Sequence, residues 1–192
     1  MINQYFLPLN IEKKDIFKPN WIRPYNGKVK WKNINYVKSI FSDYFFDKLN
    51  SIKEIEGTII FNKMYHENPI DAHTDIYVYN NKVIFIPYGL NIVFDDNKDM
   101  KSKMCWYSTK NETNEQQISW SIGNTPYINY SIKDLILQEE QYFGNGIALV
   151  RTDVPHAIFS GKKFRTCISI RFKNYDGGWE NGYNLFNNAF NQ

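Results

Sequence analysis

Short runs of β-branched and aromatic residues, separated by turn residues, divide the chain from residue 57 to residue 173. Helical patterns do not alternate with these runs, as they would in a chain of βαβ units. The sequence therefore predicts a mainly-β core across residues 57–173, folded as a double-sheet jelly roll or a barrel. Eight runs have the length and composition of strands: Thr58–Phe61, Ile76–Tyr79, Val83–Ile86, Leu90–Phe94, Met104–Tyr107, Ile118–Ile122, Ile147–Val150 and Thr166–Phe172.

The segments outside and within this core include two predicted helices. Residues 1–56 begin irregularly, and Tyr36–Ile52 then places apolar residues at helical spacing, so we expect an N-terminal helical layer packed on a sheet. Ser131–Gln141 is expected to form one short helix with Ser131 as its N-cap. Residues 174–192 are rich in Gly, Asn and aromatic residues, and we expect a docked tail or a flap. A chain of 192 residues is predicted to form a single domain, residues 1–192.

Charge and cysteine content restrict the partners of the protein. A net charge of +3 is too mild for a dedicated nucleic-acid binder. No apolar run approaches the roughly 20 residues of a membrane span, and the first ten residues lack the pattern of a signal peptide. The two cysteines, Cys105 and Cys167, are expected to be reduced, buried thiols. We therefore expect a cytoplasmic protein without a membrane or nucleic-acid partner, and its oligomeric state stays open.

Histidine is scarce, and two of the three histidines stand in a pattern that suits a metal ion. His73 and Asp75 occupy positions i and i+2 where a predicted strand begins, so both side chains point to one face. His156 follows about 80 residues later and can complete the set. Two histidines and one carboxylate on one face of an octahedron are diagnostic of non-haem Fe(II) oxygenases. We predict that His73, Asp75 and His156 are metal ligands; the H-x-D pattern alone also allows a satisfied histidine beside a surface aspartate.

Arginine is also scarce, and two of the four arginines lie in the last predicted strand. Arg165, Cys167, Ser169 and Arg171 share one face of that strand, because side chains alternate with a period of two. Two arginines inside a barrel are costly unless they meet an anion, and a dicarboxylate would supply one. The alternative is that this face is exposed to solvent.

The motif H-T-D, the later P-H and the arginine nine residues beyond it together resemble the Fe(II)/2-oxoglutarate-dependent dioxygenases. The spacing from His156 to Arg165 is similar to that in prolyl hydroxylases and in free-proline hydroxylases related to aspartyl/asparaginyl hydroxylases. Tyr65, eight residues before His73, and the run IFIPYGLNIVF add to a resemblance that spans about residues 58–172. It implies a double-stranded β-helix (jelly-roll) fold, in agreement with the strand pattern.

Two features of the last strand leave the choice of arginine open. The run RTCISIR is also similar to the R-x-N-x-x-x-R of alkylated-nucleobase demethylases, with Cys167 where they carry Asn. Some other family members place the cosubstrate arginine about 15 residues after the distal histidine, which here selects Arg171. Arg165 is therefore the first choice for the cosubstrate, and Arg171 is the alternative.

The resemblance implies an enzyme that uses Fe(II), 2-oxoglutarate and O2. His73, Asp75 and His156 would hold the iron, and Arg165 would pair with the distal carboxylate of 2-oxoglutarate. The implied reaction is hydroxylation of an amino acid, a small metabolite or a protein side chain, with release of succinate and CO2. Candidates for hydrogen bonds to the cosubstrate are Tyr65, Asn91 and Ser169, and candidates for a substrate wall are Trp106, Tyr107 and Trp179.

Two other classes of protein remain alternatives. The first is a non-catalytic jelly-roll binding or structural module, in which the three ligand residues coincide by chance or are remnants. The second is a cupin-type metalloenzyme that does not use 2-oxoglutarate, although the usual cupin order of paired His and Glu before a later His is absent. A nucleobase demethylase needs a basic groove and a stacking aromatic residue, and the lysines here are scattered.

Overall fold

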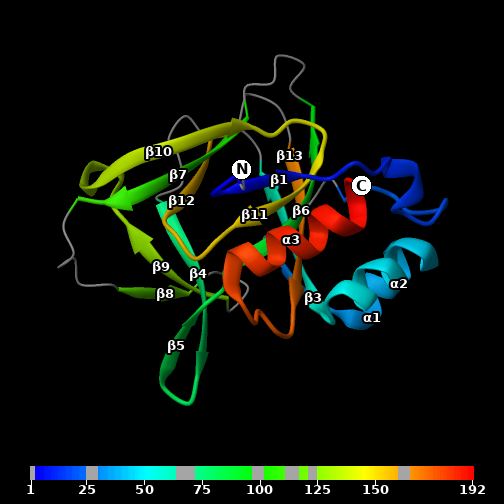
Figure 1. The fold of residues 1–192 in the computed structure, drawn as a ribbon, viewed down its shortest axis with the longest axis horizontal. Coiled ribbons are helices and arrows are strands. Elements are labelled where there is room, and N and C mark those ends of the chain that lie inside the picture. The colour runs from blue at the N-terminus through cyan, green and yellow to red at the C-terminus, as the bar shows by residue number, and fades with distance from the viewer. Residues whose placement is uncertain are drawn as a thin grey trace.

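Two large antiparallel sheets form most of the structure (Figure 1). The computed structural model describes residues 3–24, 30–63, 72–96, 102–110, 117–120, 125–159 and 165–192. The sheets pack on one another through a buried cluster that takes Val93 and Val150 from the first sheet and Met104 and Trp106 from the second. The prediction of a mainly-β fold is confirmed.

The first sheet has the strand order β1-β11-β6-β13-β3-β2 in the described residues. Its central strand, β13, pairs with β6 on one side and with β3 on the other, and all of its residues are buried. A strand buried on both faces forms the most protected part of a sheet. The bounds are β1 Phe6–Pro8, β2 Lys30–Asn33, β3 Ile55–Lys63, β6 Tyr88–Asp95, β11 Ile147–Arg151 and β13 Arg165–Phe172.

The second sheet has the strand order β10-β7-β12-β4-β9-β8, and β5 pairs with β4 outside this path. Each run predicted as a strand coincides with or overlaps a strand of the structure, although residues 121 and 122 lie outside the described ranges. The sequence did not predict β1, β2, β9, β10 or β12. The bounds are β4 Ala72–Tyr79, β5 Lys82–Phe85, β7 Lys103–Thr109, β8 Ile118–Trp120, β9 Pro126–Tyr130, β10 Leu135–Tyr142 and β12 His156–Phe159.

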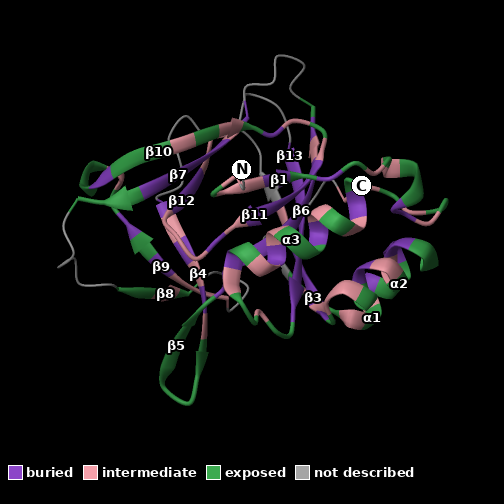
Figure 2. Ribbon diagram, viewed as in Figure 1, coloured by how far each residue is buried: buried purple, intermediate pink, exposed green. Residues whose placement is uncertain are grey.

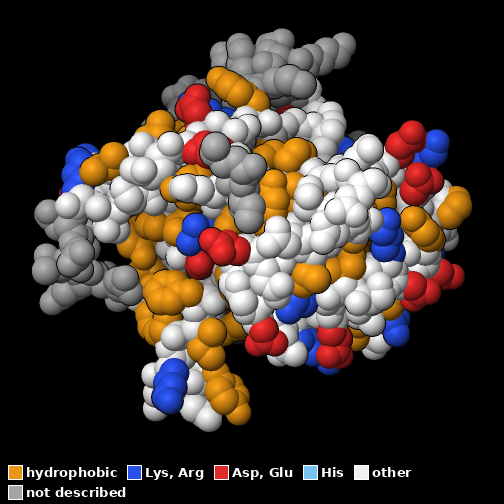
Figure 3. Space-filling model, viewed as in Figure 1, with side chains coloured by type: hydrophobic (Ala, Val, Ile, Leu, Met, Phe, Trp, Pro, Cys, Tyr) orange, Lys and Arg blue, Asp and Glu red, His pale blue; other side chains and the backbone are white. Residues whose placement is uncertain are grey.

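The hairpin formed by β4 and β5 projects from the body of the molecule (Figures 1 and 3). Asn80 and Asn81 form its two-residue turn, and both have positive φ, the conformation that a type I′ hairpin turn requires. Several apolar side chains near the tip are exposed, including Tyr79 and Ile84. Figure 2 shows this contrast between the exposed hairpin and the buried strands β6, β11 and β13.

Three α-helices in the described residues cover the outer face of the first sheet: α1 (Ile34–Ile40), α2 (Asp43–Ile52) and α3 (Gly178–Phe190). Their buried residues join one apolar cluster with the side of β13 that carries Ile168, Ile170 and Phe172. The opposite side of β13 therefore faces the second sheet. Two 3-10 turns, η1 (Lys13–Asp15) and η2 (Ile132–Asp134), complete the regular structure of the described residues.

The expected N-terminal helical layer is not evident, because residues 1–56 also supply the two edge strands β1 and β2 of the first sheet. The single helix expected over Tyr36–Ile52 is two helices. The chain is extended at Phe41, whose side chain is buried, and Ser42 then caps α2 by accepting a hydrogen bond from the Phe45 amide. Burial of Phe41 and a new cap therefore interrupt the helical spacing.

The helix predicted over Ser131–Gln141 is wrong. Only the short turn η2 is helical, Ser131 makes no side-chain cap, and the residues from Leu135 onward form strand β10. The Leu, Gln and Glu residues there favour a helix by intrinsic propensity. Pairing with β7 along the whole length of β10 overrides that weak preference.

The C-terminal segment docks on the body of the protein, as expected for a docked tail, and it does so as a helix. This helix, α3, buries Trp179, Phe186 and Phe190 against the outer face of the first sheet. No helix in the described ranges combines the length and the apolar character needed to cross a membrane.

Candidate functional site

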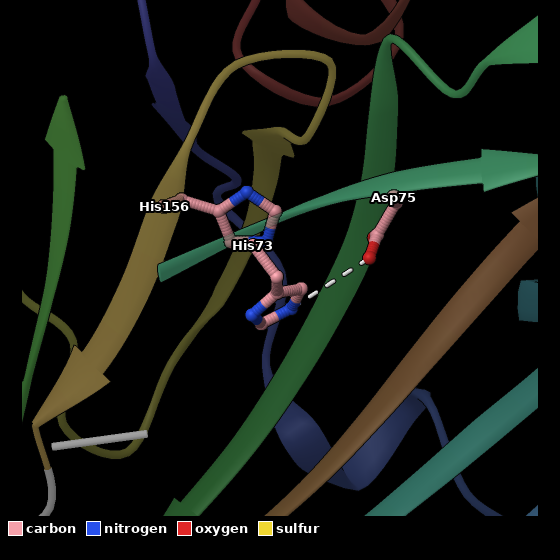
Figure 4. Close-up of side chains that lie close together, drawn as sticks. All are labelled: His73, Asp75 and His156. Carbon is pink, nitrogen blue, oxygen red and sulfur yellow. Dashed lines mark ion pairs between the residues drawn. The ribbon is translucent and has the colours of Figure 1, made fainter. Parts of the chain in front are cut away.

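His73, Asp75 and His156 come together between the two sheets (Figure 4). His73 and Asp75 lie two residues apart on β4, and His156 on β12 is the cross-strand partner of His73. One possible ligand atom from each residue lies within 4.8 Å of those of the other two. This distance allows one metal ion to contact all three side chains, which provide two nitrogen ligands and one oxygen ligand.

The orientation of His156 suits a metal ligand. Its Nδ1–H donates to the backbone carbonyl of Val154 at 2.9 Å, which leaves Nε2 as the nitrogen with a lone pair. Metal-bound histidines commonly donate their other ring N–H in this way. Burial, together with the charge of the nearby His73, lowers the pKa of His156 to about 4, so the imidazole is neutral near pH 7.

Asp75 is held by an arginine on its far side. Arg171 Nη2 donates to Asp75 Oδ2 at 2.6 Å, whereas Asp75 Oδ1 lies 3.7 Å from His73 Nε2. Burial alone would raise the pKa of Asp75, but the positive charge of Arg171 and the neighbouring imidazoles lower it below its ordinary value. One carboxylate oxygen is thus fixed by the arginine and the other faces the histidines.

The Arg171 guanidinium fits because the facing residue on β6 is glycine. A Cβ on Gly89 would lie 2.6 Å from Arg171 Nη1 and 3.1 Å from Ser169 Oγ. Contacts this short require one of the groups to move. Gly89 therefore provides the space that allows Arg171 to reach Asp75.

A line of buried polar atoms leads away from this group along β13 and β6. Ser169 and Asn91 are cross-strand partners, and Arg165 lies further along the same face of β13, 3% exposed. Within the described part of the chain, Arg171 Nε and Nη1, Ser169 Oγ, Asn91 Oδ1 and Arg165 Nε have no hydrogen-bond partner. Each buried polar atom left unpaired costs about 1–3 kcal/mol. This polar line therefore suits a polar occupant that the protein encloses.

A cavity of about 370 Å³ has both Asp75 and Arg171 in its lining. Its volume is within the range of small-molecule sites. Most of its wall is apolar, and the polar side chains of Glu56, Tyr77 and Thr125 also line it. The further lining residues include Trp31, Ile59, Ile86 and Pro126.

The structure brings some of the other predicted residues to this region and places others elsewhere. Trp106 is the cross-strand partner of His156, but it is fully buried in the core between the sheets and donates to the Arg151 carbonyl. Tyr107 lies in a cluster on the opposite face of the second sheet, because side chains alternate along β7. Trp179 belongs to α3 and packs on the outer face of the first sheet. The prediction that Tyr107 and Trp179 form a substrate wall is therefore corrected.

Tyr65 and His66 lie outside the described residues, so the predicted role of Tyr65 stays a prediction. Arg165, Asn91 and Ser169 all lie on the face of the first sheet that meets the second, as expected for Arg165 and Ser169. The alternative that this face of β13 is exposed to solvent is wrong, because Arg165 and Arg171 are 3% and 4% exposed.

Four further residues at the site were not predicted. Tyr77 could have been found, since it is four residues beyond His73 on the same face of β4. Tyr127 on β9 pairs with Asp75 and places its ring edge-on to His73, with 5.9 Å between ring centroids. No sequence pattern could have indicated Trp31 or Glu56. The direction of the Trp31 side chain depends on the pairing of the edge strand β2, and that of Glu56 depends on a bulge in β3.

A comparison with protein-family models finds no family that matches this chain, and a comparison with curated proteins finds no significant match. The assignment of a function therefore depends on the geometry of the site.

Proposed function

We propose that this protein is an Fe(II)- and 2-oxoglutarate-dependent oxygenase. The observation that carries the proposal is the position of the His73, Asp75 and His156 group beside a buried line of unpaired polar atoms that includes both arginines of β13. The two histidines and the aspartate suit a divalent metal ion, and the unpaired polar atoms beside them suit an enclosed anion next to that ion. A chelating dicarboxylate meets both requirements at once.

The donor set fits iron. Two imidazoles and one carboxylate form the combination typical of non-haem Fe(II) oxygenases, in which three coordination positions stay open for other ligands. His156 is oriented by Val154 and Asp75 by Arg171, so two of the three ligands have fixed directions. His73 packs against His156, with 4.4 Å between the ring centroids.

The polar line fits 2-oxoglutarate. We assign the distal carboxylate to Arg165, since Arg171 already pairs with Asp75, and we assign hydrogen bonds along the chain of the cosubstrate to Ser169 and Asn91. A guanidinium grips a carboxylate with two parallel hydrogen bonds. When bound, iron, 2-oxoglutarate and O2 would supply the oxidising power to hydroxylate a C–H bond, with release of succinate and CO2. The protein residues hold these groups and enclose them.

The strand order supports a jelly roll as the scaffold. Along the chain, β3, β6, β11 and β13 belong to the first sheet, while β4, β7, β10 and β12 belong to the second. The chain moves between the sheets at most steps, as in a double-stranded β-helix. In this arrangement strands β4 and β12 face β13, so His73, Asp75 and His156 lie opposite the face of β13 that carries the two arginines, which supports the proposed metal site.

The proposal is tested by titrating the metal-free protein with Fe(II) and then 2-oxoglutarate under anaerobic conditions. We expect the weak visible charge-transfer band of a chelated 2-oxo acid, and we expect His73→Ala to abolish it while the circular dichroism spectrum stays unchanged. Iron binding without 2-oxoglutarate binding would indicate a cupin-type enzyme. Binding of neither would indicate a non-catalytic jelly-roll module.

A further inference from the structure

The cavity next to His73, Asp75 and His156 contains a carboxylate, Glu56, that is not one of the three proposed metal ligands. Glu56 lies at an irregularity of strand β3, where the pairing shifts from Arg171–Gly57 to Phe172–Ile55 and leaves Glu56 as the extra residue. A bulge of this kind redirects a side chain. Ile55 consequently packs in the core under the helices, and Glu56 faces the cavity.

One oxygen of Glu56 is held by a neighbour. The Tyr77 hydroxyl donates to Glu56 Oε2. Burial, the nearby Tyr175 and Glu56 itself raise the pKa of Tyr77, so the hydroxyl keeps its proton and remains a donor. The other oxygen, Oε1, receives no hydrogen bond from the described residues.

The charges of the cavity wall do not cancel. Its lining includes two carboxylates, Asp75 and Glu56, and one cation, Arg171. Arg171 is paired with Asp75 at 2.6 Å. In the described ranges no lysine or arginine pairs with Glu56. A negative charge therefore faces the cavity without a cationic partner among the described residues.

The rest of the wall is suited to an aliphatic chain. The Trp31 ring lies close against Gly57, where a Cβ would lie 2.6 Å from Trp31 Cζ2. Ile59 and Ile86 add apolar surface. A cavity lined by both an aromatic ring and a carboxylate favours a cation on a short apolar stem, because aromatic rings attract cations and pack on apolar stems.

We propose that the cavity binds the substrate through an ammonium or guanidinium group that pairs with Glu56, while the stem of that group packs on Trp31. This assignment names the substrate class of the proposed oxygenase and rests on that function for its catalytic meaning. The pairing itself requires neither iron nor 2-oxoglutarate. The cation can belong to a free amino acid or amine, or to a lysine or arginine side chain of a peptide.

The test measures ligand binding to the full chain without metal, by calorimetry or ligand-observed NMR. The cationic probes are L-arginine, L-lysine and Nα-acetyl-arginine amide, and the neutral probes of similar shape are citrulline and norleucine. We expect the cations to bind at least about tenfold more tightly than the neutral probes. Equal binding, or no binding of any cation at millimolar concentration, would overturn the proposal. The blocked arginine distinguishes a peptide side chain from a free amino acid.

Two matched variants complete the test. Glu56→Gln should lower the affinity for the cations to that of the neutral probes and leave the neutral probes unchanged. Glu54→Gln makes the same change two residues away, where the side chain is exposed and paired with Lys173. This control should change neither the affinity for the cationic probes nor that for the neutral probes. Unchanged cation affinity in Glu56→Gln would also overturn the proposal.

The outcomes separate this assignment from the proposed function. Glu56→Gln should keep the charge-transfer band with iron and 2-oxoglutarate. If the wild-type protein shows no such band but binds arginine through Glu56, the oxygenase proposal fails and the cation site stands. If the band forms and no cation binds preferentially, the cation site fails alone.

Discussion

At the scale of single residues, the two arginines of β13 have different surroundings and are assigned different roles. Arg171 contacts Asp75 directly, so we assign it the positioning of a proposed metal ligand. Arg165 lies at the other end of the same face and has an unpaired Nε among the described residues. The spacing of the two arginines from His156 in the sequence allowed either Arg165 or Arg171 to bind the cosubstrate.

Substituting each arginine separately distinguishes these roles. Arg171→Gln should weaken Fe(II) binding by roughly 10–100-fold, because Asp75 loses the group that orients it. Arg165→Gln should leave Fe(II) binding unchanged and raise the KM for 2-oxoglutarate by roughly tenfold or more, through loss of a charge-assisted pair. Anaerobic metal titration and succinate assays measure the two effects. An effect on 2-oxoglutarate from Arg171→Gln alone would assign the cosubstrate to Arg171.

The buried His156 predicts a pH dependence of stability in the metal-free protein. Its pKa is about 4 in the folded state and near 6.5 when unfolded, so the unfolded state binds more protons between these values. The free energy of unfolding should therefore fall as the pH falls from about 6.5 to about 4, by up to about 3 kcal/mol. Asp75 titrates below this range, because its pKa is lowered from 3.8.

Urea unfolding of the metal-free protein across this pH range measures the effect. His156→Gln has no titrating group at this position and should show a shallower dependence than the wild type. Equal slopes for the two proteins would show that burial of His156 does not control stability in this range.

At the scale of secondary-structure elements, strand irregularities and glycines shape the site. The bulge in β3 directs Glu56 into the cavity, and Gly89 in β6 leaves space for Arg171. β10 shows the same dominance of pairing over local preference, since a helix-favouring sequence forms a strand beside β7. Strand pairing therefore decides both the presence of an element and the direction of its side chains.

Gly89→Ala should damage the site through the strand that supports it. The added methyl group would meet Arg171 Nη1 at 2.6 Å, so we expect the guanidinium to leave the position in which it pairs with Asp75. We expect weaker Fe(II) binding and a loss of about 1–3 kcal/mol in unfolding free energy. Gly146→Ala is the control, because its Cβ would meet Phe143 at an ordinary 3.4 Å. Equal iron affinity in the two variants would contradict this role for Gly89.

At the scale of the whole molecule, the first sheet separates two environments. Its outer face and the helices form the main apolar core, while its inner face carries the arginines and faces His73, Asp75 and His156. Stability and chemistry therefore depend on opposite faces of one central strand, β13.

Phe186→Ala tests this separation. Phe186 is fully buried under α3, and its truncation should lower the free energy of unfolding by about 3–5 kcal/mol. Below the unfolding transition, the affinities for Fe(II) and 2-oxoglutarate should be unchanged, because α3 packs on the outer face. Leu185→Ala on the same helix is partly exposed and should have a much smaller effect on stability. A large change in cosubstrate affinity in Phe186→Ala would show that the two faces are coupled.

The sequence by itself determined the mainly-β fold, the shared face of His73 and Asp75, and the shared face of Arg165 and Arg171. These properties follow from the alternation of side chains along a single strand, which is local. Only the tertiary structure decided that His156 lies opposite His73, that Arg171 binds Asp75, and that Glu56 faces the cavity. These depend on the register between strands far apart in the chain, and a shift of one residue would reverse the face to which every side chain of a strand points.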